Sequence, residues 1–204
     1  MRQVTGKTNP ESTANKVSIQ LALDGHSFSV DGHPGTGGEP LTVEIRSPRT
    51  LLVPEALFAP ERAELLLAAD GKAPLYGEVA VWSEPADGMV AVMAVPKEVL
   101  AQVKEQAGPD RALHYTTPLC FPLNPSRPTA QVQYLAGYLY IKIYHAGLRL
   151  AEVLPAPEEA DLRYVFERLE REFPARQFSL QLLGAEAHPI AKLVGKYYHD
   201  TRCE

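Results

Sequence analysis

The tetrapeptide Asp24-Gly25-His26-Ser27 offers the clearest chemical possibility in the chain. The backbone N–H groups of an Asp–Gly turn can cradle a phosphate, while the aspartate positions water on a bound magnesium ion. The turn lies between two segments whose apolar residues alternate, which predicts a β-hairpin. A plain β-turn without a ligand explains the same residues, and it is the interpretation that we favour.

The tripeptide Asp-Gly-His recurs at residues 31–33, which raises the possibility of a metal site. An extended strand of seven residues spans on the order of 20 Å, too far for the two copies to share one ion. We therefore expect two polar turns and no metal. The other histidines have no close-paired ligand spacing, and no catalytic residue is expected.

Tyrosines alternate with apolar residues along 137–144, so Tyr138, Tyr140, Lys142 and Tyr144 share one face of a predicted strand. If exposed, this tyrosine face could stack the bases of a single-stranded nucleic acid. If covered, it would belong to the core or to an interface with a partner protein. We favour the second interpretation and treat these residues as a candidate interaction surface.

Composition and charge narrow the class of protein. The 204 residues are 45% hydrophobic and 22% charged, which is typical of a globular chain. The net charge of −5 argues against binding to duplex DNA or an anionic membrane. The N-terminus lacks the apolar core of a signal peptide, no segment resembles a membrane span, and two cysteines do not indicate a disulfide framework. These features favour a cytoplasmic protein.

Alternating apolar residues predict strands at 16–23, 28–30 and 41–45, which we expect to form an antiparallel meander. Residues 1–15 are expected to be a disordered tail. A helix is predicted at 61–69, two strands at 77–83 and 89–95, and a second helix from Pro96 to a C-cap at Gly108. A strand near 113–115 completes this part.

Prolines cluster at 118–128 and predict a linker. After them, strands are predicted at 131–135, 138–144 and 148–154. Residues 157–173 carry an apolar stripe at helical spacing. A strand at 178–182, ended by Gly184, and a helix from Pro189 follow.

Both parts thus run meander, helix, strand and helix, the ribonuclease-H-like plan, and two such lobes in tandem make the actin-like plan. The expected fold is α/β with mixed sheets. Its first lobe covers 16–117, the interlobe linker 118–130 and the second lobe 131–204.

The segments 17–30, 52–58 and 113–119 together resemble a bacterial family, the domain of unknown function 3822. The resemblance extends from about Lys16 to the end of the chain. It implies an actin-like fold and implies no activity.

Actin-like ATPases hold ATP and a divalent metal between their lobes, with one hairpin loop from each lobe around the phosphates. No Asp or Glu occurs from Gln131 to Ala151, where the second loop would lie at residues 134–137 or 145–147. Efficient hydrolysis is therefore not expected. We predict a degenerate nucleotide site and a non-catalytic scaffold that binds an unknown protein. The alternatives are an ATP or ADP switch, with magnesium, using Asp24, Gly25, Ser27 and Gly184, and single-stranded nucleic-acid binding by the tyrosine face.

Overall fold

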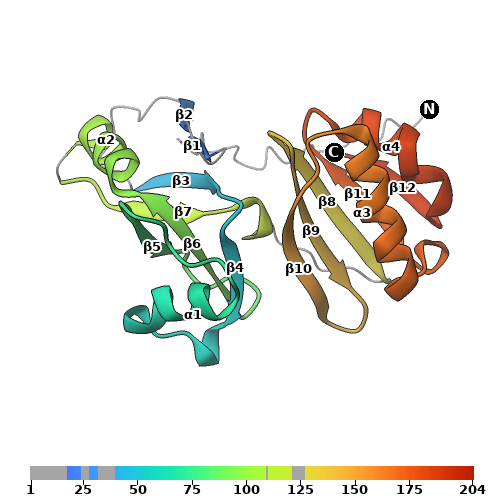
Figure 1. The fold of residues 1–204 in the computed structure, drawn as a ribbon, viewed down its shortest axis with the longest axis horizontal. Coiled ribbons are helices and arrows are strands. Elements are labelled where there is room, and N and C mark those ends of the chain that lie inside the picture. Colours follow the sequence, from blue (N-terminus) through green and yellow to red (C-terminus); the bar gives the residue numbers. More distant parts are fainter. Residues whose placement is uncertain (1–17, 24–27, 32–39, 109, 121–126) are drawn as a thin grey trace, which may run out of the picture.

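The computed structural model describes residues 18–23, 28–31, 40–108, 110–120 and 127–204. Figure 1 shows two bodies side by side, each with its own sheets and helices. The described residues up to 120 form the first, called the N-terminal half, and those from 127 form the second, the C-terminal half. The whole is a mixed α/β fold with several sheets.

A four-stranded sheet of the N-terminal half has the order β2-β1-β3-β7. Its strands are β1 (Ser18–Leu23), β2 (Phe28–Asp31), β3 (Leu41–Arg46) and β7 (Leu113–Thr116). Strand β1 pairs with β2 antiparallel but with β3 parallel, and β3 also pairs with β7 parallel. The expected antiparallel meander is therefore wrong beyond the first hairpin. Alternating apolar residues locate a strand, but they do not encode the direction of its neighbour.

A second, three-stranded sheet with the order β4-β6-β5 packs beside the first. It consists of β4 (Thr50–Pro54), β5 (Glu78–Trp82) and β6 (Met89–Pro96), all paired antiparallel. Helix α1 (Ala63–Ala69) covers one face, and α2 (Lys97–Ala107) packs in the core shared with β3. The short helices η1 (Glu55–Leu57) and η2 (Pro60–Arg62) precede α1. The predicted end of α2 at Gly108 is confirmed, with φ of 94°.

The C-terminal half has one five-stranded sheet with the order β10-β9-β8-β11-β12. Strands β8 (Thr129–Leu135), β9 (Tyr138–Tyr144) and β10 (Leu148–Pro155) form an antiparallel meander, as predicted. Strand β11 (Ser179–Leu183) then runs parallel to β8, and β12 (Asp200–Cys203) runs parallel to β11. Parallel strands put their carboxyl ends at one edge of the sheet, which matters for the site.

Helices α3 (Glu159–Glu172) and α4 (Ala187–Val194) cover the side of this sheet that faces away from the N-terminal half (Figure 1). Their core includes Leu139, Ile141 and Phe166. The backbone N–H of Glu158 donates to the Asp161 carboxylate at 3.1 Å, which fixes the start of α3. The short helices η4 (Ala175–Gln177) and η5 (Gly195–Tyr197) follow α3 and α4.

Two strands are absent from the sequence prediction. Strand β4 follows β3 after a three-residue break and contains Leu51, Leu52 and Val53, a short apolar run without a clean alternation. Strand β12 carries mostly polar residues at the sheet edge. Neither has the period-two pattern on which strand prediction depends.

The two halves meet through a small apolar cluster and an ion pair. Leu119, in the short helix η3 (Pro118–Cys120), packs with Tyr140 of β9 and Val153 of β10. Lys72, just after α1, contacts Glu152 of β10 at 3.0 Å and Asp70 at 2.7 Å.

Among the described residues no helix is both long enough and apolar enough to cross a membrane.

Candidate functional site

The edge of the C-terminal sheet shows where a phosphate loop of this half would lie. Residue Gln133 of β8 is paired with Leu183 of β11, so the Ala136-Gly137 turn and Gly184 follow two strands that end side by side. The Ala146-Gly147 turn joins β9 to β10 at the other end of these strands. Of the two positions left open by the sequence, only residues 134–137 lie beside Gly184. Asp24, Gly25 and Ser27 lie outside the described residues.

Around the Gly137 and Gly184 turns this edge is engaged in backbone hydrogen bonds and lies near glutamates. The Gly137 carbonyl accepts a hydrogen bond from the Ala156 N–H at 2.7 Å, and a Cβ built on Gly137 would lie 3.4 Å from Pro157 Cα. The Gly184 N–H already donates to the Glu204 carbonyl at 2.9 Å. The turn itself supplies no side-chain oxygen, and the segments that end here carry Glu158, Glu186 and Glu204. Carboxylates repel a phosphate unless a metal lies between them.

A metal-binding group is also missing from what the structure describes at this edge. No cluster of three or more His, Cys, Asp or Glu side chains able to hold an ion occurs among the described residues. Gly184 keeps φ of 86°, a left-handed conformation that a turn requires. Its neighbour Gln133 has a buried side-chain carbonyl without a partner in the described structure. Among the described residues, this arrangement closes a strand end and shows no built phosphate cradle.

The tyrosine face turns toward the N-terminal half. Tyr140 and Lys142 are each only 3% exposed, and Tyr138 and Tyr144 are half-buried. Tyr138 and Tyr140 belong to the apolar cluster with Leu119 that joins the halves. Tyr140 and Lys142 are covered within the chain, because β9 is a central strand and its second face packs toward the N-terminal half. Base stacking would need these side chains open to solvent.

Burial changes the acid–base chemistry of this strand. Desolvation lowers the pKa of Lys142 to about 8, although the nearby Cys120 and Asp87 oppose the change. Its ammonium lies 6.0 Å from the centre of the Tyr144 ring. Burial also raises the pKa of Tyr140 far above its ordinary value. The folded protein therefore releases the Lys142 proton at a lower pH than the unfolded chain does.

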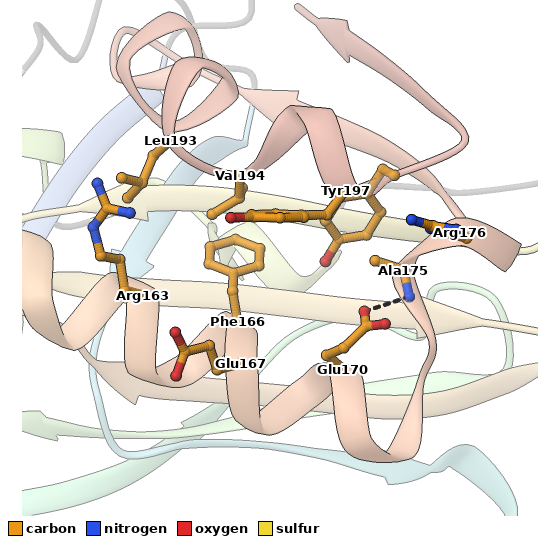
Figure 2. A pocket seen from close by; sticks show the side chains of 10 residues that line it. Arg163, Phe166, Glu167, Glu170, Ala175, Arg176, Leu193, Val194 and Tyr197 are labelled. Atoms are coloured by element: carbon orange, nitrogen blue, oxygen red, sulfur yellow. Dashed lines mark hydrogen bonds between the residues drawn. The ribbon is translucent and has the colours of Figure 1, made fainter.

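The C-terminal half has a groove between α3 and α4. It consists of two adjoining hollows of about 400 and 490 Å³ that share Arg163 and Leu193. We call it the α3–α4 groove. Its floor is apolar and includes the buried Leu162, Phe166, Ile190 and Val194. Figure 2 shows Phe166 pointing from α3 toward Val194 and the tyrosine side chains.

Aromatic side chains line one end of this groove. Tyr197 is 51% exposed, and the Lys196 ammonium lies 5.0 Å from the centre of its ring. Tyr198 packs edge to face on Phe166, with ring centres 6.3 Å apart. Burial raises the pKa of Tyr198 far above its ordinary value, and the nearby Glu170 adds to the rise. Glu170 itself accepts the Ala175 N–H at 2.6 Å (Figure 2).

Charges of opposite sign occupy the two sides of the groove. The acidic wall is the α3 side, with Glu159, Glu167 and Glu170 around Arg163, which pairs with Glu159 at 2.8 Å. The basic wall is formed by α4, η4 and η5, where the three cationic residues Lys192, Lys196 and Arg176 outnumber the one carboxylate, that of Glu186 at the start of α4. No ion pair found among the described residues crosses from one wall to the other.

Sequence reasoning identified the apolar stripe of α3 but not the groove beside it. The available signal was the spacing of charges: Glu159, Arg163, Glu167 and Glu170 repeat every three or four residues, and so do Lys192 and Lys196. Side chains at that spacing share one helix face. That the two faces oppose each other depends on the packing of α3 against α4, which a single sequence does not encode.

Comparison with solved structures identifies the class: this is an actin-like ATPase fold. A Bacteroides thetaiotaomicron protein with that fold and of unknown function matches with a TM-score of 0.70 and 15% identity, over 93% of this chain and 91% of that chain. At such an identity the likeness shows the fold alone. The search for family models found no match, and neither did the search of curated proteins.

Two further solved structures are much less similar. The cytoplasmic domain of EpsL, an inner membrane component of the type II secretion system of Vibrio cholerae, matches with a TM-score of 0.41 and 9% identity over 81% of this chain and 80% of that chain. An Aquifex aeolicus PPX-GPPA enzyme matches with a TM-score of 0.30 and 20% identity over 50% of this chain and 43% of that chain. Neither likeness is close enough to support an argument about this protein.

Proposed function

We propose that the protein is a non-catalytic interaction scaffold built on the actin-like fold, and that its partner is another protein. The observation that carries this proposal is the α3–α4 groove, an open hollow with an apolar floor on the face of the C-terminal half that the rest of the described chain leaves uncovered. Apolar grooves are a recurring docking site for amphipathic helices of partner proteins.

The proposed organisation is two tandem ribonuclease-H-like lobes, residues 16–117 and 131–204, joined by the proline-rich segment 118–130. The strand pairings support it. In the N-terminal half, β1 lies between an antiparallel β2 and a parallel β3, which is followed by a parallel β7. In the C-terminal half, β8 lies in the same way between β9 and β11, followed by β12. Membership of the domain of unknown function 3822 family is part of the same proposal and rests on the sequence resemblance.

A degenerate nucleotide site fits this proposal. The Ala136-Gly137 turn is the position in the C-terminal half that corresponds to the Asp24-Gly25 turn under the proposed organisation. It has no side-chain oxygen that could hold a metal ion, and the N–H of the nearby Gly184 already donates to the Glu204 carbonyl. A phosphate loop of an active ATPase must bring donors and a metal-bound water to the leaving group.

The two unpaired cysteines also support a reducing compartment such as the cytoplasm.

Thermal unfolding with and without excess Mg-ATP or Mg-ADP tests the proposal. A ligand present at 100 times its dissociation constant adds about 2.7 kcal/mol of stability to the native state. We expect no change in melting temperature with either nucleotide and no phosphate release from ATP.

A rise in melting temperature that Asp24→Ala abolishes would overturn the degenerate site in favour of the nucleotide switch, with Gly184 beside the bound nucleotide. Phosphate release above that of an Asp24→Ala control would overturn the non-catalytic assignment itself.

A further inference from the structure

The α3–α4 groove has the length of a short helix. Its lining extends along α3 from Glu159 to Glu170, a rise of about 17 Å at the α-helical spacing. The buried Phe166 and Val194 and the half-buried Leu193 give it an apolar floor. An occupant that fills it needs about three helical turns and one apolar stripe.

The walls of the groove favour recognition through side chains. Both walls are helical for most of their length, so their backbone N–H and C=O groups are largely engaged within α3 and α4. Without a strand edge in the lining, an extended peptide would gain no ladder of backbone hydrogen bonds. A helix satisfies its own backbone and presents a ridge of side chains that fits between two helices.

The charges of the groove define the flanks of such a helix. Glu167 and Glu170 face the occupant from the acidic wall, while Lys192, Lys196 and Arg176 face it from the basic wall. All five are exposed, and no ion pair in the described structure joins one wall to the other. A helix that lies between them must therefore meet negative charge on one side and positive charge on the other.

We propose that the α3–α4 groove binds an amphipathic helix of a partner protein whose apolar stripe is flanked by basic residues on one side and acidic residues on the other. The basic flank lies against the acidic wall and the acidic flank against the basic wall. This segregation sets the direction in which the helix docks, since the reversed orientation brings like charges together. The inference rests on the proposed function and names its partner.

The probe is a displayed library of peptides of about 18 residues, about five helical turns. Each has leucine at positions i, i+4, i+7 and i+11, and each flanking position is randomised between Glu and Lys. The full chain is the target. We expect the selected peptides to carry Glu along one flank and Lys along the other.

The double variant Lys192→Glu/Lys196→Glu tests the orientation of a selected peptide. It should weaken binding at least about tenfold, equivalent to about 1.4 kcal/mol. A peptide whose acidic flank is changed to lysine should regain affinity for this variant. The matched control, Lys97→Glu/Lys104→Glu, makes the same charge change at exposed positions of α2 and should leave binding unchanged.

Four outcomes overturn the proposal: no peptide bound more tightly than about 100 µM, selected peptides without segregated charges, binding that survives the double variant, or a dimer of the chain that the double variant dissociates. The last would assign the groove to a second copy. None of these depends on nucleotides, so a failure here is distinct from the failure of the non-catalytic assignment, which the thermal shift with Mg-ATP decides.

Discussion

Replacing Lys142 by methionine should remove part of the pH dependence of the protein's stability. Methionine keeps the unbranched length of the lysine side chain and needs no hydration. Desolvation lowers the pKa of Lys142 from 10.5 to about 8 in the folded protein. Because one pKa unit corresponds to about 1.4 kcal/mol, burying the charged form costs roughly 3 kcal/mol compared with the neutral form.

The sign of the pH effect follows from proton binding. Between pH 8 and 10.5 the unfolded chain keeps a proton on Lys142 that the folded protein has released. The free energy of unfolding of the native sequence therefore rises with pH in this window. Below pH 8 the lysine is charged in both states, and the cost of burying it is fully present.

Urea unfolding followed by circular dichroism at several pH values from 7 to 10.5 measures this effect. We expect the free energy of unfolding of Lys142→Met, relative to that of the native sequence, to fall by about 2–3 kcal/mol across the range. Tyr140 and Tyr198, whose pKa values burial raises, titrate in both proteins and cancel in the difference. Lys97→Met, at an exposed lysine, controls for the loss of a positive charge. If the difference in free energy of unfolding between Lys142→Met and the native sequence stays constant with pH, the lowered pKa of Lys142 is refuted.

Three other changes give distinct outcomes. Leu119→Ala, at the apolar contact between the halves, should lower the free energy of unfolding by about 2–5 kcal/mol in urea titrations. Lys72→Met should cost less than about 1 kcal/mol and less still in high salt, because its ion pairs are partly exposed. Burial lowers the pKa of Lys72, but hydrogen bonds to Asp70 and Glu152 outweigh this effect, so the pKa in the folded protein is raised. Any stability that these ion pairs contribute is therefore lost as the pH rises above 10.5. Gly108→Ala should cost about 1–3 kcal/mol by thermal or urea unfolding, since φ is 94° and no atom lies near the added methyl group.

Local sequence patterns were sufficient for most elements of the fold. The apolar stripe of α3, the Gly108 cap of α2 and the alternating strands β8, β9 and β10 each depend on residues close together in the chain, and all are confirmed. The parallel pairing of β1 with β3 was not predicted, because it depends on which distant strand lies alongside. The pattern of β3 is the same for either direction.

The candidate site could be predicted only in part, for the same reason. Sequence placed Tyr140 and Lys142 on one face of a strand, and this is how β9 presents them. Whether that face meets solvent depends on the N-terminal half, which covers it with η3 and its neighbours. The charges of the α3–α4 groove were visible as repeats at helical spacing, but their opposition across a hollow depends on tertiary packing.

The sheet of the C-terminal half explains why the groove is its available binding surface. A sheet has two faces, and here one is covered by the N-terminal half through Tyr140 and Leu119, while the other is covered by α3 and α4. The strand ends near Gly184 are engaged by backbone hydrogen bonds and surrounded by glutamates. The groove lies between the two helices, where an apolar floor and exposed charges occur together. A partner that binds there leaves the contact between the halves intact, so Leu119→Ala should loosen the halves without reversing the charge preference of the groove.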